Sequence, residues 1–293
     1  MGLLLLAAAL LPPVSLGAQV RGSLFIVGGG GQPDSLVTRF VMLAGGPGRA
    51  RILVLPMAGG PEPEAGGAEK AEQLRAFGAD ADVLEAGPAN GDDPALVRQV
   101  EAATGIWFTG GDQVLLVDAL RGTAVLRALR ARYRAGAVIG GTSAGAAVMG
   151  DSMLTGNQRR PDSLGYYGDE FPEVARGVME VRPGLGLLPG VLVDQHFVRR
   201  ERANRLLAAV LERPAMLGVG IDEGTAVEVA PDGHWSVTGR GLVIVLDARR
   251  GQVLPAGPLG GTEVRLQVLP PGSRYDPRTG RATLPAAVGP RSR

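Results

Sequence analysis

The sequence predicts an α/β fold in which a mostly parallel sheet is flanked by helices. Short apolar runs of the kind found in buried strands alternate with segments of helical periodicity, and this alternation is typical of βαβ units. Three polar or glycine-rich segments directly follow such runs, at Gly28–Gly31, Gly110–Gln113 and Ser143. Because functional loops gather at the carboxyl ends of parallel strands, we expect the three segments to converge on one site.

The individual strands and helices are predicted from the apolar runs and from the segments of helical periodicity. Aliphatic and β-branched runs predict strands over residues 21–27, 50–56, 82–85, 105–108, 137–139, 191–197 and 216–221, with an extended segment at 225–229. Apolar residues spaced three and four apart predict helices over 36–43, 69–77, 93–103, 114–120, 123–135 and 199–212. A Pro/Gly/Glu-rich stretch at 61–68 and a polar stretch at 157–176 are expected to be loops. Val237 and residues 242–246 predict a C-terminal β hairpin.

The composition favours a single large domain, expected over residues 21–250. Of 293 residues, 45% are hydrophobic and 20% are charged, while only 4% are aromatic, so the core must be built from aliphatic side chains. The 30 basic residues nearly balance the 29 acidic ones, which gives no reason to expect nucleic acid or an anionic membrane as a partner. The sequence shows no internal repeat and no second segment with its own core.

Both ends of the protein differ from the middle. Residues 1–18 open with an apolar run that is too short to span a bilayer but long enough for a signal-peptide core. We therefore expect a signal peptide there, export to the periplasm or the extracellular space, and no membrane association after processing; a buried N-terminal helix is the alternative. Residues 251–293 are rich in Pro, Gly and Arg and are expected to form a partly disordered extension, with the last dozen residues disordered.

The strongest chemical motif is Gly141-Thr-Ser-Ala-Gly145. A serine on a sharp strand-to-helix turn adopts a strained backbone, and its neighbours must be small for the turn to close. The hydroxyl then lies beside the first N–H groups of a helix, which can stabilise an oxyanion. A glycine-rich turn with an incidental serine is the alternative. Because an apolar strand precedes the motif and a small-residue helix follows it, we favour a nucleophile at Ser143.

A serine nucleophile needs a general base and a group that orients the base. Of the two histidines, His234 lies in a turn signature, whereas His196 lies at the end of a predicted buried strand, so His196 is the preferred base. A buried histidine without a catalytic role is the alternative. Glu223, at the end of the strand over 216–221, is the preferred orienting acid, with Asp162 as the alternative. The lack of cysteine and of an H-E-x-x-H motif argues against a metal site or another cofactor.

The sequence resembles the cyanophycinase branch of the S51 serine peptidase family, which also contains aspartyl dipeptidases. The resemblance extends from about residue 22 to about residue 246. It rests on four motifs in order, at Phe108–Gln113, Gly141–Ala146, Asp194–Phe197 and Gly220–Glu223. It implies a fold like the class I glutamine amidotransferase domain and a triad of Ser143, His196 and Glu223. It also implies hydrolysis of cyanophycin, a poly-aspartate that carries arginine on each β-carboxyl, to β-Asp-Arg dipeptides through an acyl-enzyme.

The resemblance assigns further roles by motif. Backbone N–H groups of Gly111 and Ala144 would form the oxyanion hole, and the substrate pocket would be lined by Gln113, Asp194, Gln195, Arg200, Arg202 and Arg205. Guanidinium groups bind carboxylates bidentately, which suits an acidic polypeptide substrate. The alternative is that Arg200, Arg202 and Arg205 belong to an ordinary solvent-exposed face that is rich in arginine. A homodimer is compatible with the family.

Two other functions stay open at this point. One is the same chemistry on aspartyl or isoaspartyl dipeptides. The other is a non-catalytic protein that binds acidic peptides through its arginines.

Overall fold

A computed structural model describes residues 20–60, 63–158, 171 and 173–286. The predicted signal peptide over residues 1–18, the candidate acid Asp162 and residues 287–293 lie outside these ranges.

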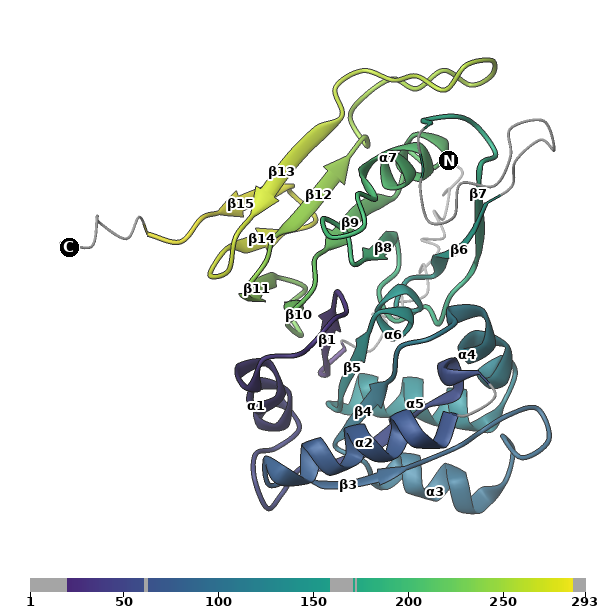
Figure 1. Ribbon diagram of the computed structural model, residues 1–293, viewed down its shortest axis with the longest axis vertical. Helices are drawn as coiled ribbons and strands as arrows, with labels where there is room; N and C mark the ends of the chain where they lie inside the picture. Colours follow the sequence, from purple (N-terminus) through teal and green to yellow (C-terminus); the bar gives the residue numbers. More distant parts are fainter. Residues whose placement is uncertain (1–19, 61–62, 159–170, 172, 287–293) are drawn as a thin grey trace, which may run out of the picture.

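The body of the molecule is a sheet that is parallel from β1 (Ser23–Val27) to one of its edges (Figure 1). Its parallel strands, in spatial order, are β1, β5 (Val138–Thr142), β4 (Gly105–Phe108), β2 (Arg51–Leu55) and β3 (Asp80–Val83). The antiparallel strands β10 (Thr225–Val229), β11 (Trp235–Gly239), β14 (Arg274–Asp276) and β15 (Arg281–Thr283) extend it beyond β1. The predicted α/β class with a largely parallel sheet is confirmed.

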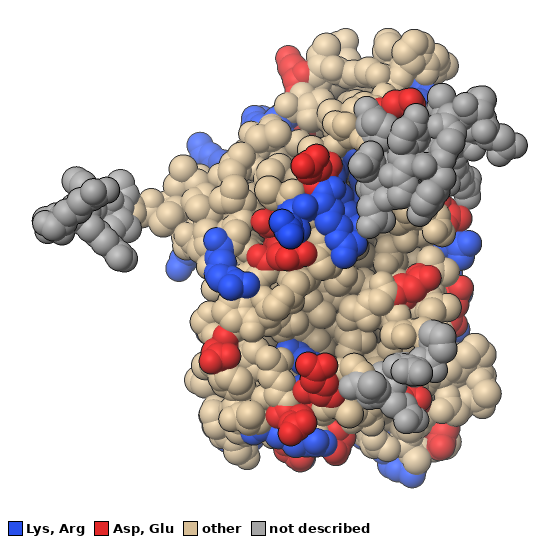
Figure 2. Space-filling model, in the orientation of Figure 1, with Lys and Arg blue, Asp and Glu red and all other residues tan. Residues whose placement is uncertain are grey.

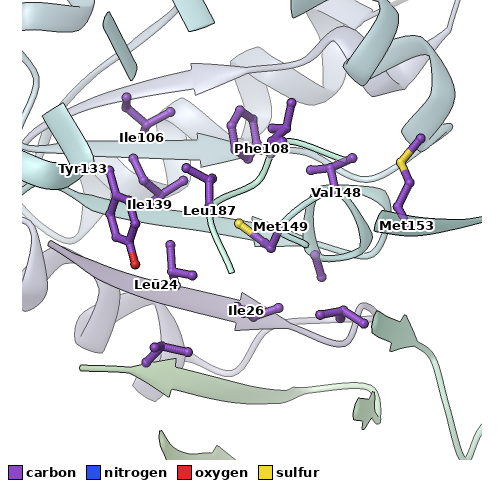
Figure 3. Close-up of a cluster of buried hydrophobic side chains, with 14 of the residues drawn as sticks. Leu24, Ile26, Ile106, Phe108, Tyr133, Ile139, Val148, Met149, Met153 and Leu187 are labelled. Atoms are coloured by element: carbon purple, nitrogen blue, oxygen red, sulfur yellow. The ribbon is translucent and has the colours of Figure 1, made fainter. Parts of the chain in front are cut away.

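Helices cover both faces of the parallel strands because successive strand side chains point to opposite faces. On one face, Phe25 and Val27 join a buried cluster with α1 (Asp34–Leu43) and α2 (Pro63–Ala76). On the other, Leu24 and Ile26 pack with the remaining helices, as Figure 3 shows together with Ile106, Phe108 and Ile139. Those helices are α3 (Pro94–Ala102), α4 (Gln113–Leu120) and α5 (Ala124–Ala135).

A second sheet lies beside the first. It consists of β8 (Val191–Gln195), β9 (Leu217–Ile221), β12 (Val243–Asp247) and β13 (Arg265–Leu269), and α7 (Ala203–Glu212) packs on it. Strands β8 and β9 are parallel, so their carboxyl ends meet at one edge. The hairpin of β6 (Ser152–Gln158) and β7 (Met179–Pro183) follows the short helix α6 (Ala144–Ala147).

Three local predictions are wrong. Val237 and residues 242–246 do not pair with each other, because β11 pairs with β10 and β14 in the main sheet, whereas β12 pairs with β9 and β13 in the second. Of the loop expected at 61–68, residues 63–68 are instead the start of α2, whose first residue is a proline, a position where proline is tolerated; residues 61–62 lie outside the described ranges. Disorder over the last dozen residues does not hold for residues 282–283, which lie in β15.

Within the described part of the protein, no helix combines the length and apolar character needed to cross a bilayer.

Candidate active site

Ser143 lies on a strained turn between β5 and α6. Its backbone has φ 54° and ψ −113°, a conformation that costs a residue other than glycine about 1–3 kcal/mol. The small neighbours are required by contact: a Cβ on Gly141 would lie 2.4 Å from the carbonyl oxygen of Gly145, and one on Gly145 would lie 2.5 Å from that of Phe108. The turn expected from the motif is therefore the turn that forms.

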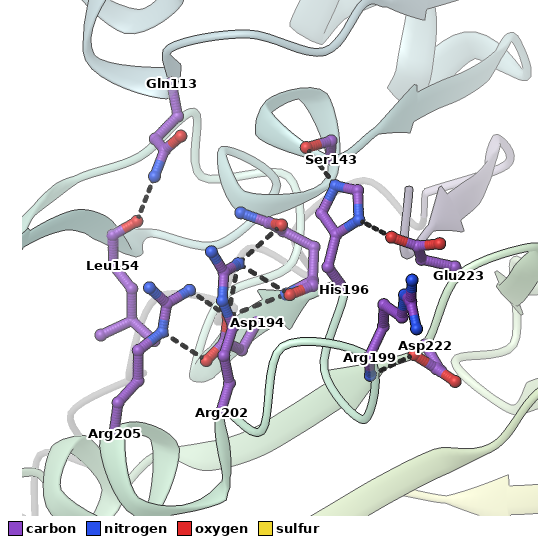
Figure 4. Close-up of polar contacts among 11 residues, drawn as sticks. Gln113, Ser143, Leu154, Asp194, His196, Arg199, Arg202, Arg205, Asp222 and Glu223 are labelled. Atoms are coloured by element: carbon purple, nitrogen blue, oxygen red, sulfur yellow. Dashed lines mark hydrogen bonds and ion pairs between the residues drawn. The ribbon is translucent and has the colours of Figure 1, made fainter. Parts of the chain in front are cut away.

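His196 directly follows β8 and reaches Ser143 from the second sheet. Its Nε2 is 2.9 Å from Ser143 Oγ, as Figure 4 shows. The residue itself has φ 48°, and its N–H donates to the carbonyl oxygen of Gly28 at 2.6 Å. The two side chains are 53 positions apart in the sequence, yet they lie within hydrogen-bond distance. His234, the other histidine, is exposed and lies beside Asp232.

Glu223 completes a line of three side chains. Its Oε1 is 2.6 Å from His196 Nδ1, because Glu223 follows β9, the parallel neighbour of β8. Asp222 points the other way and accepts from the N–H of Arg199 at 3.0 Å, as expected from the alternation of side chains along an extended backbone. The structure therefore brings together the three residues predicted as nucleophile, base and orienting acid.

The charges around the imidazole favour its neutral form. Burial lowers the pKa of His196, and the nearby cations Arg200 and Arg202 lower it further, while the hydrogen bond to Glu223 opposes them. That hydrogen bond is the main reason why the pKa of Glu223 is lowered. At neutral pH Glu223 is ionised and accepts a hydrogen bond from the N–H at Nδ1, so Nε2 carries no proton and can accept the hydroxyl proton of Ser143.

The glycine loop after β1 passes directly under the line of three side chains. A Cβ on Gly29 would lie 2.4 Å from the His196 ring, and one on Gly30 would lie 2.8 Å from Glu223 Oε2. Glycine is required here because no side chain fits between the loop and the triad. This agrees with the expectation that the segment Gly28–Gly31 converges with Ser143 on one site.

Two backbone N–H groups lie next to the nucleophile. Ala144 is the first residue of α6, and Gly111 follows Gly110, whose added Cβ would lie 3.4 Å from that of Ser143. Across the described residues, neither the N–H of Ala144 nor that of Gly111 donates to another residue. Both groups can therefore donate to a substrate oxygen, and their role as an oxyanion hole stays a prediction. Asp112, in the same loop, accepts from the N–H of Val114 at 2.7 Å and so caps α4.

Most of the predicted substrate-binding side chains form a buried network instead of an open surface. Asp194 is fully buried and receives both Nε (2.8 Å) and Nη2 of Arg205. Arg202 Nη1 donates to the carbonyl oxygen and to Oε1 of Gln195, each at 2.8 Å. These contacts fix the carboxyl end of β8, directly before His196 (Figure 4).

The remaining two differ from each other. Gln113 is buried and donates to the carbonyl oxygen of Leu154 at 2.9 Å. Arg200 is exposed, as is Arg199. Figure 2 shows basic side chains gathered near the middle of one face of the molecule. Substrate contact by any of these six residues stays a prediction.

A cavity of about 620 Å³ adjoins the nucleophile. It is lined by residues of five segments: Gly30, Gly31, Gln32; Gly59; Gly66, Glu69, Lys70, Gln73; Trp107, Thr109, Gly110; and Thr142. Sequence reasoning missed Lys70, Gln32 and Trp107. The signal that could have pointed to them is that Lys70 is the only lysine of the protein. Among the described residues, no cluster of three or more potential metal ligands is found.

Comparisons with known proteins agree on one family. The model of peptidase family S51 matches residues 24–235. A cyanophycinase from Geminocystis herdmanii is 35% identical over 272 residues, covering 89% of this chain and 95% of that protein. A cyanophycinase from Thermosynechococcus vestitus is 36% identical over 255 residues, covering 83% and 74%. The crystal structure of a peptidase from an acI-B1 Actinobacterium matches with a TM-score of 0.61 and 25% identity, covering 86% of this chain and 99% of that one.

Proposed function

Because the chain belongs to peptidase family S51, we propose that it is a serine exopeptidase that hydrolyses cyanophycin to β-Asp-Arg dipeptides. The observation that carries the proposal is the continuous hydrogen-bonded line from Ser143 Oγ through the His196 ring to Glu223 Oε1, with distances of 2.9 and 2.6 Å. The relatives named cyanophycinase support the substrate.

The first half of the reaction forms an acyl-enzyme. Ser143 Oγ attacks the carbonyl carbon of the scissile amide while His196 Nε2 takes the hydroxyl proton. The resulting oxyanion accepts hydrogen bonds from the N–H groups of Gly111 and Ala144. The C–N bond then breaks, His196 returns the proton to the leaving amine, and the dipeptide leaves.

The second half releases the acyl group. A water molecule gives its proton to His196 Nε2 and attacks the ester carbon, and the proton then passes to Ser143 Oγ as the ester bond breaks. Glu223 stays ionised throughout and stabilises the imidazolium that forms twice in the cycle. No cofactor is needed for these steps.

The charges of the site suit a substrate that carries both signs. Each residue of cyanophycin presents one carboxylate and one guanidinium group. Arg199 and Arg200 are exposed next to the triad and can receive carboxylates, which bind guanidinium groups through two parallel hydrogen bonds.

The test is incubation of the purified protein with cyanophycin, followed by identification of the products by mass spectrometry. We expect β-Asp-Arg from the wild type and a loss on the order of 10³-fold or more in Ser143→Ala. Hydrolysis of aspartyl or isoaspartyl dipeptides without hydrolysis of the polymer would favour the dipeptidase. Absence of turnover, together with no labelling of Ser143 by a sulfonyl fluoride, would favour a non-catalytic acidic-peptide binder.

We also propose that the protein is exported and forms a homodimer. Export is supported by the signal-like residues 1–18, and it is tested by the N-terminal sequence of the protein secreted by its own cells. Light scattering of the purified protein tests the dimer. An unprocessed N-terminus or a monomer mass would refute the respective proposal without affecting the chemistry.

A further inference from the structure

Lys70 lies in the cavity that adjoins the nucleophile. The lining of this 620 Å³ space includes Lys70 together with Thr142, the residue before Ser143, and Gly110, whose added Cβ would lie 3.4 Å from that of Ser143. A substrate whose scissile carbonyl meets Ser143 therefore has this cavity open beside it.

Among the described residues, the Lys70 ammonium contacts only neutral groups. Its Nζ donates to Gln32 Oε1 at 2.7 Å and to Gln73 Oε1 at 2.8 Å, and it lies 4.2 Å from the centre of the Trp107 ring. Only 8% of the residue is exposed. Within the described ranges, no carboxylate lies within ion-pair distance of this nitrogen. Buried lysines are almost always paired, and an ammonium has three donors, of which two are used here.

Three further polar groups of the cavity lining lack partners. Trp107 Nε1, Thr109 Oγ1 and Thr142 Oγ1 are buried and make no hydrogen bond within the described structure. Buried polar groups in proteins are nearly always satisfied, and an exception calls for a bound partner. The cavity thus offers one cation to a polar ligand, and three of its lining residues carry a buried polar atom without a partner in the described structure.

We propose that Lys70 binds a carboxylate of the substrate in this cavity and so positions the leaving dipeptide against Ser143. The inference rests on the proposed function. In cyanophycin the carboxylate has two sources, the one at the C-terminus of the backbone and the one of an arginine attached to a β-carboxyl. Both present the same chemistry to an ammonium, which forms a charge-assisted hydrogen bond with either. Glu69, which also lines the cavity, is available to the guanidinium group of the same residue.

Protonation of Lys70 gives the proposal a second readout. Burial lowers the pKa of Lys70 to about 7, and Glu69 is the other titratable group that lines the cavity. Only the protonated ammonium attracts a carboxylate, so kcat/KM falls as the pH rises through about 7. The neutral His196 required for proton transfer gives the opposite, rising limb at lower pH. The wild-type profile is therefore bell-shaped, and its basic limb belongs to Lys70.

The experiment compares Lys70→Met with the wild type on a synthetic dimer of β-Asp-Arg units. Three substrates are used: the free acid, the form amidated at the backbone C-terminus, and the form with amidated arginines. We expect Lys70→Met to lower kcat/KM on the free acid by ~10- to 100-fold and to lose the basic limb. The wild type loses the same factor on whichever amide removes the bound carboxylate, and the variant loses nothing more on it. Lys70→Arg should restore part of the rate.

The controls separate this inference from the proposed function and from misfolding. A sulfonyl fluoride carries no carboxylate, so Ser143 should be labelled at the wild-type rate in Lys70→Met. No hydrolysis by the wild type would refute the proposed function itself. Unchanged kcat/KM and an unchanged basic limb in an active, folded Lys70→Met would overturn the role of Lys70 alone. If that variant does not fold, full activity of the wild type on both amides overturns it equally.

Discussion

Gly29→Ala should disable the enzyme without removing any chemical group. Gly29 has φ +104°, and an added Cβ would lie 2.4 Å from both Cε1 and Nε2 of His196. Ordinary contact begins near 3.4 Å, so the ring must retreat by roughly 1 Å, and a misplacement of that size costs on the order of 10²-fold in rate. The shift breaks the 2.9 Å hydrogen bond between Nε2 and Ser143 Oγ.

A matched control separates this contact from backbone strain. Gly48 has φ +74° and no atom within 4 Å of an added Cβ, so Gly48→Ala carries the left-handed strain of about 1–2 kcal/mol but no clash. We expect both variants to lose a few degrees in Tm. Only Gly29→Ala should lose kcat/KM, measured as release of β-Asp-Arg from cyanophycin.

Two results would refute the reasoning. If Gly29→Ala keeps the wild-type kcat/KM, the imidazole does not need its present position. If Gly48→Ala loses as much activity as Gly29→Ala, strain rather than contact with His196 is responsible.

Three more predictions concern neighbouring side chains. Glu223→Gln should lower kcat on the order of 10³- to 10⁴-fold, because the amide no longer selects the correct tautomer of His196; single-turnover kinetics with less than a tenfold loss would contradict this. Arg200→Ala removes a cation that lowers the pKa of His196, so the acidic limb of the pH–kcat/KM profile should move to higher pH. An unmoved limb in that variant would show that Arg200 does not act on the imidazole. Asp194→Asn leaves the buried guanidinium of Arg205 without its carboxylate and should destabilise the fold by about 3–5 kcal/mol. Urea unfolding measures this, the double variant with Arg205→Met should recover part of the loss, and no recovery would contradict the pairing.

That Ser143, His196 and Glu223 lie together could be predicted because strand ends are visible in a sequence. Ser143, His196 and Glu223 each follow an apolar run, and each run is a buried strand. The rule that loops at the carboxyl ends of parallel strands converge then suffices to bring them together. The rule works even though β5 and the pair β8–β9 belong to different sheets, a division for which the sequence has no signal.

Pairing between distant residues was beyond sequence reasoning. The spacing of Arg202 and Arg205 indicates one helix face, which suited a solvent-exposed patch that binds carboxylates. In the structure both side chains are buried, and the carboxylate they meet is that of Asp194 in the same protein. Whether a charged residue is paired can be decided only when its neighbours in space are known. For the same reason the sequence did not indicate the cavity around Lys70.

The loop after β1 explains why the three catalytic candidates hold one geometry although they come from separate strands. Three successive carbonyl groups accept from two of these candidates and from a neighbour of the third. That of Val27 accepts from the N–H of Ser143 at 3.1 Å, that of Gly28 from the N–H of His196 at 2.6 Å, and that of Gly29 from the N–H of Gly224, next to Glu223, at 2.9 Å. Each of these hydrogen bonds is made by backbone groups, so the loop needs no side chain for them. Because Gly29 and Gly30 have no side chain, the loop can lie close to His196 and Glu223. The loop thereby fixes the positions of nucleophile, base and acid relative to one another. A methyl group at Gly29 pushes against His196 and also against this loop, so it should lower the rate of the reaction although it removes no catalytic group.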